Sequence, residues 1–173
     1  MEPTTESTTA PAPPNAVFSA EDDLETLWFK AYQGEVSGQT LFAAVAARQD
    51  DPDKRRKMEM LANLEDRTRQ ACVPAMERHG FPTAPDEATV RDASALGEAA
   101  AGLGWTDFVG AFEAITTQFV ALYERIGEVS APDRAESELL VAHEHALREF
   151  ARRELAGRTD DSLALIEALP HMQ

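Results

Sequence analysis

The apolar positions of the chain recur every three to four residues over long stretches, and no stretch alternates apolar and polar residues with a period of two. The longer spacing places apolar side chains on one face of an α-helix. It predicts four long helices, near residues 19–49, 52–79, 106–128 and 130–156. Two shorter helices are expected around residues 86–100 and from Asp160 to Leu169. The pattern therefore predicts an all-α protein.

Residues that favour helix ends agree with these boundaries. Ser19 is a good N-cap for the first helix, and Asp51 followed by Pro52 is a good start for the second. Gly80 is placed to end the second helix in a left-handed conformation. Pro74 lies inside that helix and lacks an N–H to donate, so a kink or break is expected there.

The order of the helices predicts how they pack. Short turns join the first long helix to the second and the third to the fourth, which favours two antiparallel hairpins. The connection between the hairpins is much longer, and it predicts a crossover that runs along a four-helix bundle. We expect a disordered tail at residues 1–18, the bundle at residues 19–157, and a short C-terminal helix and tail at residues 158–173.

The composition narrows the classes of function. Acidic residues number 31 against 16 basic ones, which gives a formal charge of −15. Nucleic acids and anionic membranes bind basic surfaces, so neither is expected as a partner. Cys72 is the sole cysteine, no apolar stretch is long enough to cross a bilayer, and the N-terminal residues lack the pattern of a signal peptide. A cytoplasmic protein is expected, and the sequence leaves open whether it forms a homo-oligomer.

Two acidic residues interrupt the apolar faces of the first hairpin. Glu35 lies on the apolar stripe of the first long helix, and Glu65 lies on that of the second. Glu35 precedes the turn near residue 50 by fifteen residues, and Glu65 follows it by fifteen. At a rise of about 1.5 Å per residue, both carboxylates are expected at the same height, roughly 22 Å from the turn. An unpaired buried carboxylate is costly, so the two are expected to face each other.

The other two long helices add further candidates. In the fourth, His143 and Glu144 flank an apolar seam near the middle of the helix. In the third, Glu113 is the best-placed acid, on a stripe beside the main apolar one. The candidate metal ligands are thus Glu35, Glu65, Glu113, His143 and Glu144, and the candidate catalytic groups are Glu35, Glu65 and His143.

Facing carboxylates in an apolar interior repel each other and resist ionisation, so they need a proton, an arginine or a cation between them. No lysine or arginine falls on the same stripes, which favours a cation. Carboxylate oxygens with few nitrogens suit iron or manganese, as one or two ions. The sequence carries no thiolate set for zinc or an iron–sulfur cluster, and no nucleotide or flavin signal.

Three segments, together with the long crossover, resemble the ferritin-like superfamily, the rubrerythrin and di-iron carboxylate group. They are GEVSGQTLFAAVA around Glu35, LEDRT around Glu65 and AHEHALREF around Glu144. The resemblance covers roughly residues 20–157 and implies a ferritin-like four-helix bundle around a metal site. It implies one glutamate ligand from each long helix, which are by position Glu35, Glu65, Glu113 and Glu144.

The chain departs from that family at its histidines. Two helices of the family carry Glu-x-x-His, whereas Thr68 and Leu147 stand at the corresponding positions here. His143 is left as the nitrogen donor.

Three functions from different classes follow from these observations. The first is a carboxylate-bridged metal oxidase or oxygenase that acts on a small molecule or on dioxygen or peroxide. The second is a metal-free enzyme in which a buried glutamate serves as general acid or base. The third is a non-catalytic bundle with a role in stress, storage or interaction, which the missing histidines favour.

Overall fold

The computed structural model describes residues 17–173, and these residues form helices and loops without a strand, so the all-α prediction is confirmed. The principal helices are α1 (Leu24–Ala46), α2 (Pro52–His79), α3 (Glu87–Ala100), α4 (Trp105–Gly110), α5 (Phe112–Val129), α6 (Arg134–Leu155) and α7 (Ala164–Glu167). Two 3₁₀ turns, η1 (Ala131–Asp133) and η2 (Pro170–Met172), complete the described chain. The predicted disordered tail lies outside the described residues, except for Val17 and Phe18, which pack against the core.

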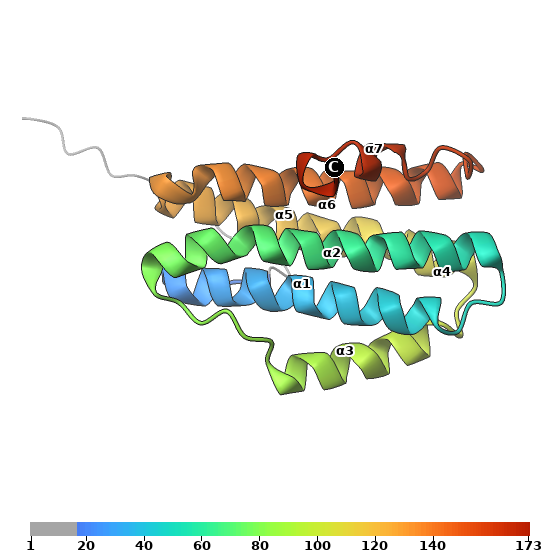
Figure 1. The fold of residues 1–173 in the computed structure, drawn as a ribbon, viewed down its shortest axis with the longest axis horizontal. Coiled ribbons are helices and arrows are strands. Elements are labelled where there is room, and N and C mark those ends of the chain that lie inside the picture. Colours follow the sequence, from blue (N-terminus) through green and yellow to red (C-terminus); the bar gives the residue numbers. More distant parts are fainter. Residues whose placement is uncertain (1–16) are drawn as a thin grey trace, which may run out of the picture.

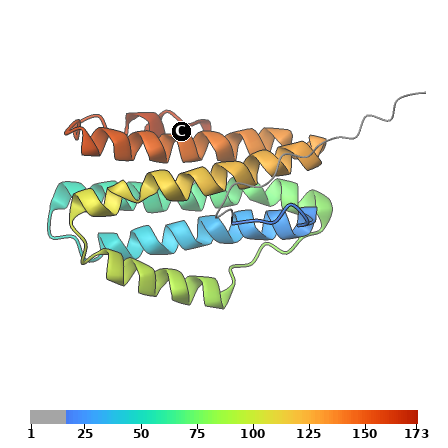
Figure 2. The same cartoon turned by 180° about the vertical axis from the view of Figure 1, so that it is seen from behind.

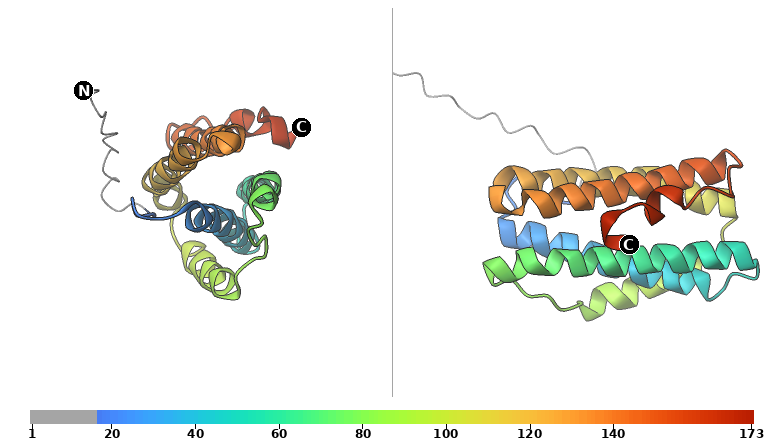
Figure 3. Two further views of the ribbon diagram at one scale, coloured as in Figure 1. Left: turned by 90° about the vertical axis from the view of Figure 1, so that its left-hand side faces the viewer. Right: turned by 45° about the horizontal axis from the view of Figure 1, so that its top comes forward.

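The four long helices α1, α2, α5 and α6 lie side by side along the molecule (Figures 1 and 2). α1 packs against α2, and α5 packs against α6, so each predicted hairpin is present. α2 ends at one end of the molecule and α5 begins at the other, and the connection between them runs back along α1 (Figure 1). This connection carries α3, which packs on the outside of α1 (Figure 3). The predicted crossover is therefore observed.

The ends of α2 follow from its capping residues as predicted. The side chain of Asp51 accepts hydrogen bonds from the N–H groups of Asp53 and Lys54, and Pro52 occupies the first helical position. At the other end Gly80 has φ 73°, in the left-handed region that glycine enters at little cost. α2 runs without interruption through Pro74, so the predicted break is absent. The buried residues that flank Pro74 hold this turn against the rest of the core.

Other predicted boundaries are wrong by a few residues. α1 begins at Leu24 because Asp23, rather than Ser19, accepts the capping hydrogen bond, which comes from the N–H of Thr26. The third long helix is divided at Ala111 into α4 and α5. The final helix is only α7, and Asp160 belongs to the turn that precedes it and makes no cap.

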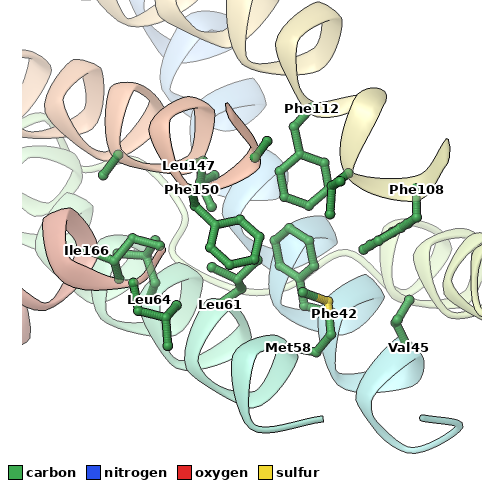
Figure 4. Packing of buried hydrophobic residues seen from close by; sticks show 14 of the residues in the cluster. Phe42, Val45, Met58, Leu61, Leu64, Phe108, Phe112, Leu147, Phe150 and Ile166 are labelled. Carbon is green, nitrogen blue, oxygen red and sulfur yellow. The ribbon is translucent and has the colours of Figure 1, made fainter. Parts of the chain in front are cut away.

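The buried apolar residues form two clusters, one toward each end of the bundle. The first includes Phe42, Leu61, Phe112 and Phe150, and Figure 4 shows how these side chains interlock. The second includes Leu27, Trp28, Met76, Leu122 and Leu140. Glu65 and Thr68 on α2 and His143 and Glu144 on α6 are buried polar residues that lie between the two clusters, and Glu35 on α1 is buried beside them. No helix among residues 17–173 is long and apolar enough to cross a membrane.

Candidate metal centre

Three of the predicted residues meet at the junction of the two apolar clusters. Glu35 comes from α1, Glu65 from α2 and His143 from α6, and all three are almost completely buried. One ligand atom from each lies within 4.8 Å of the ligand atoms of the other two. The equal distance of Glu35 and Glu65 from the α1–α2 turn brings the two carboxyl groups together, as the hairpin register predicts.

The contacts within this cluster leave some of its atoms unpaired. His143 Nε2 lies 3.4 Å from Glu65 Oε1, and His143 Nδ1 lies 3.7 Å from Glu35 Oε1. The hydroxyl of Tyr123, from α5, donates a 2.5 Å hydrogen bond to Glu35 Oε1. Glu35 Oε2 and His143 Nδ1 have no hydrogen-bond partner among the described residues. A buried polar atom without a hydrogen-bond partner costs about 1–3 kcal/mol. A metal ion bound to these atoms would remove this cost, so the donor atoms of the cluster fit a metal ion.

Burial dominates the electrostatics of the cluster. Desolvation raises the pKa of Glu35 well above its ordinary value, and the nearby His143 offsets part of this rise. Desolvation also raises the pKa of Glu65, to about 8, while the neighbouring carboxyl group of Glu35 acts in the opposite direction. The pKa of His143 is lowered by desolvation as well. Without a metal, the folded protein therefore favours protonated carboxyl groups and a neutral imidazole.

The remaining two candidates have different surroundings. Glu144 is buried on α6, and its pKa is raised well above its ordinary value by desolvation and by the charges of Glu65 and Glu35. Its carboxyl group lies beside the three-residue cluster but is not part of the set within 4.8 Å. Glu113 is exposed on the first turn of α5, and the structure does not bring it to the cluster. Val109, Thr116 and Tyr123 of the same predicted stripe are buried, so the stripe continues across Ala111 and Glu113 is its exposed member.

A glycine makes room for one of the carboxyl groups. A Cβ atom at Gly38 would lie 2.6 Å from Glu65 Oε2, closer than atoms in contact normally approach. The carboxyl group of Glu65 therefore lies directly on the backbone of α1. The sequence offers a signal here, because a glycine inside a long apolar helix face indicates a close approach.

A histidine that the sequence reasoning missed lies next to Thr68, one helical turn after Glu65. His171 Nε2 is 3.0 Å from the hydroxyl of Thr68, and the guanidinium of Arg67 donates to the carbonyl of His171. His171 Nδ1 is buried and has no partner among the described residues. Desolvation, followed by the charges of His143 and Arg67, lowers the pKa of His171 to about 4. An imidazole thus stands beside the position where the family resemblance implies one, although a different part of the chain supplies it.

The centre opens on one side into a cavity of about 410 Å³. Its walls come mainly from α1, α3, α4, α5 and α6, with Glu65 from α2, and are overwhelmingly apolar. Glu35, Glu65 and Glu144 all reach this cavity, as does Tyr123. The C-terminal segment that carries His171 lies against α2 and α6 instead (Figure 3).

Comparison of the chain with protein-family models, with curated proteins and with solved structures yields no match. Function therefore has to be argued from the chemistry and geometry of the centre.

Proposed function

We propose that the protein is a metal-dependent oxidoreductase, in which Glu35, Glu65 and His143 hold iron or manganese. The observation that carries this proposal is the convergence of three buried donor groups within 4.8 Å, with two of their atoms unpartnered. The arrangement of the long helices, with two hairpins and a crossover, supports a ferritin-like four-helix bundle. Such bundles build metal sites from inward-facing carboxylates on neighbouring helices.

The donor set favours hard metal ions. Two carboxyl groups and one imidazole suit iron or manganese better than ions that select thiolates. Cys72 is not available as a thiolate, because burial raises its pKa well above the ordinary value and its thiol donates to the carbonyl of Thr68. Glu144 and His171 lie near enough for their pKa values to be affected by charges of the centre, but neither belongs to the set of atoms within 4.8 Å.

A bound iron or manganese ion would supply one-electron chemistry toward dioxygen or peroxide. The residues of the chain orient and protect this centre. Tyr123 holds one oxygen of Glu35 in place, and the two apolar clusters exclude bulk water from both ends. Glu144 faces the cavity with a raised pKa, so it holds a proton that it can give to a bound molecule.

A metal-free acid or base is the second candidate function. It is favoured by the pKa of Glu65, which burial raises to about 8 at the inner end of the cavity. A carboxyl group with a pKa near neutrality is suited to general acid–base catalysis. His143 would then serve as its proton partner at 3.4 Å.

Elemental analysis by mass spectrometry separates the two candidates. Protein purified without chelator should contain about one or two equivalents of iron or manganese, since the centre has ligands for one ion or a pair. The Glu35→Ala, Glu65→Ala double variant should lose this metal, whereas Glu113→Ala, which removes an exposed acid of α5, should keep it. Addition of a chelator should lower the Tm of the wild type, because metal binding stabilises only the folded state.

Absence of metal from the wild type, with a Tm that a chelator does not change, would reject the metal-dependent function. A bell-shaped pH profile for an activity that survives the chelator would then identify the acid–base function.

A further inference from the structure

The cavity beside the centre has a mouth that is unusual for a soluble protein surface. Leu96 is 56% exposed, Leu103 is 55% exposed and Ile115 is 50% exposed. These are the three most exposed large apolar side chains among residues 17–173, and all three line this one cavity. Exposed apolar side chains that gather at one place, rather than scattering, mark a surface that binds something apolar.

The inner walls of the cavity are apolar, like its mouth. Phe42, Phe108, Phe112 and Phe119 line the cavity between its mouth and the carboxyl groups. The volume of about 410 Å³ falls in the range of small-molecule sites, roughly 300–1,000 Å³. Gly34 allows the aromatic wall to approach α1, because a Cβ there would lie 2.4 Å from the ring of Phe119.

The charged groups of the cavity restrict the ligand further. Glu35, Glu65 and Glu144 are its ionisable carboxyl groups, and its described lining contains no lysine, arginine or histidine. Arg148 is held to one side, where its guanidinium donates hydrogen bonds to the hydroxyls of Thr116 and Thr117. A carboxylate, sulfonate or phosphate on the ligand would therefore lose its hydration against apolar walls and find no cation to replace it.

We propose that this cavity, bounded at its mouth by Leu96, Leu103 and Ile115, binds an uncharged, apolar small molecule and presents it to the carboxylate–histidine centre. Binding follows from the cavity alone, whereas the role of this molecule as substrate rests on the proposed metal-dependent function. The molecule enters between α3 and α5, and its inner end lies against Glu35, Glu65 and Glu144.

Two fluorescent probes with the same ring system test the ligand class. N-phenyl-1-naphthylamine is uncharged, and 8-anilino-1-naphthalenesulfonate adds one sulfonate to the same rings. With chelator-treated protein, the uncharged probe should bind saturably at one site, and the sulfonate should bind at least about tenfold more weakly. Equal affinity for the two probes, or no saturable binding of the uncharged one, would overturn the proposal.

Charged substitutions at the mouth test the location. Leu96→Glu and Ile115→Glu should each weaken binding of the uncharged probe by about tenfold or more, because a carboxylate then stands in its path. Leu155→Glu and Val129→Glu are matched controls, since these side chains are 49% and 43% exposed and do not line the cavity. All four positions are exposed, so the variants should fold. Equal effects of the mouth and control variants would place the probe elsewhere.

Addition of Mn²⁺ tests whether the cavity lies next to the metal centre. The paramagnetic ion should broaden the proton NMR signals of the bound uncharged probe, and the Glu35→Ala, Glu65→Ala variant should abolish the broadening. Probe binding without binding of either Mn²⁺ or Fe²⁺ would reject the metal-dependent function and leave the apolar ligand site standing. Mn²⁺ binding without probe binding would reject the ligand class and leave the metal centre standing.

Discussion

At Gly38, the stability of α1 and the proposed metal binding make opposite demands on one residue. In the middle of a helix, alanine is favoured over glycine by roughly 1 kcal/mol. At Gly38 the new methyl group would collide with the carboxyl group of Glu65, which is the flexible end of a long side chain. The side chain can move away at little cost to the fold, but it then leaves the position where it faces Glu35.

The Gly38→Ala variant should therefore separate stability from metal binding. We expect the metal-free variant to be as stable as the wild type or more stable by up to about 1 kcal/mol, and its metal affinity to fall by about tenfold or more. Urea denaturation of the metal-free protein and a metal titration measure the two effects. Gly110→Ala is the control, because a Cβ there meets no atom within 4 Å. Unchanged metal affinity in Gly38→Ala would show that Glu65 is not a ligand.

At the scale of single residues, periodicity predicts the inward acids where a helix is unbroken. Glu35 and Glu65 lie on uninterrupted helices of one hairpin, so counting from the turn places them correctly. Glu113 opens α5 directly after the break at Ala111 and is exposed, although Val109 and Thr116 of its predicted stripe are buried. His171 belongs to no long helix, and only the chain reversal after α6 brings it to Thr68. Gly157, with φ 75°, marks the end of α6, but no local pattern predicts where the chain packs after it reverses.

Among the elements, the C-terminal segment is the one with an unexpected connection to the centre. Leu163, Ile166 and Leu169 anchor it in the apolar core, and η2 contacts α2. Arg67 and Thr68 then bind His171 from two sides. The segment covers the centre on the side of α2 and α6, and it brings an imidazole with a free nitrogen close to His143.

The His171→Ala variant should lose metal affinity with only a small loss of stability. Its imidazole is half-buried and makes one side-chain hydrogen bond, so we expect a loss of about 1 kcal/mol in the free energy of unfolding without metal. Metal affinity should fall by about tenfold, as it does when a supporting group is removed from a metal site. His145→Ala is the matched control on α6, because His145 is exposed. Equal metal affinities for both variants would remove His171 from the centre.

Helix boundaries are predictable where a capping residue has no close competitor. Asp51, Pro52 and Gly80 mark α2 unambiguously, and the structure uses all three. Before α1, both Ser19 and Asp23 are good caps, and the sequence pattern does not rank them. The structure uses Asp23, while the hydroxyl of Ser19 accepts from the N–H of Glu21 in the turn before the helix. Tertiary packing determines where α3 lies against α1, and no short stretch of the sequence predicts it.

For the whole molecule, the buried carboxyl groups link folding to proton uptake. Glu65 has a pKa of about 8, and the pKa values of Glu35 and Glu144 are raised well above ordinary values. Groups with raised acid pKa values bind more protons in the folded state than in the unfolded state. Their contribution to stability is complete below about pH 4.5 and is lost as the pH rises through the folded-state values.

The metal-free protein should therefore become less stable as the solution becomes more alkaline. Between about pH 6.5 and pH 8.5, Glu65 alone should lower the free energy of unfolding by about 2 kcal/mol, and Glu35 and Glu144 act in the same direction. His143 is neutral in this window because its pKa is lowered, and Tyr123 is neutral because its pKa is raised. Urea denaturation at a series of pH values measures the slope, and Glu65→Gln should reduce it. A flat profile in the wild type would mean that the carboxyl groups are ionised in the folded protein.

The position of the apolar cavity also bears on how long an ion would stay bound at the centre. The cavity joins the centre to the surface between α3 and α5, while the C-terminal segment covers the side of α2 and α6. A molecule seated in the cavity stands in the passage through which an ion would leave. With the proposed metal bound, ion residence would lengthen while the cavity is filled and shorten once it empties, so the metal would exchange most readily between the release of one ligand and the binding of the next.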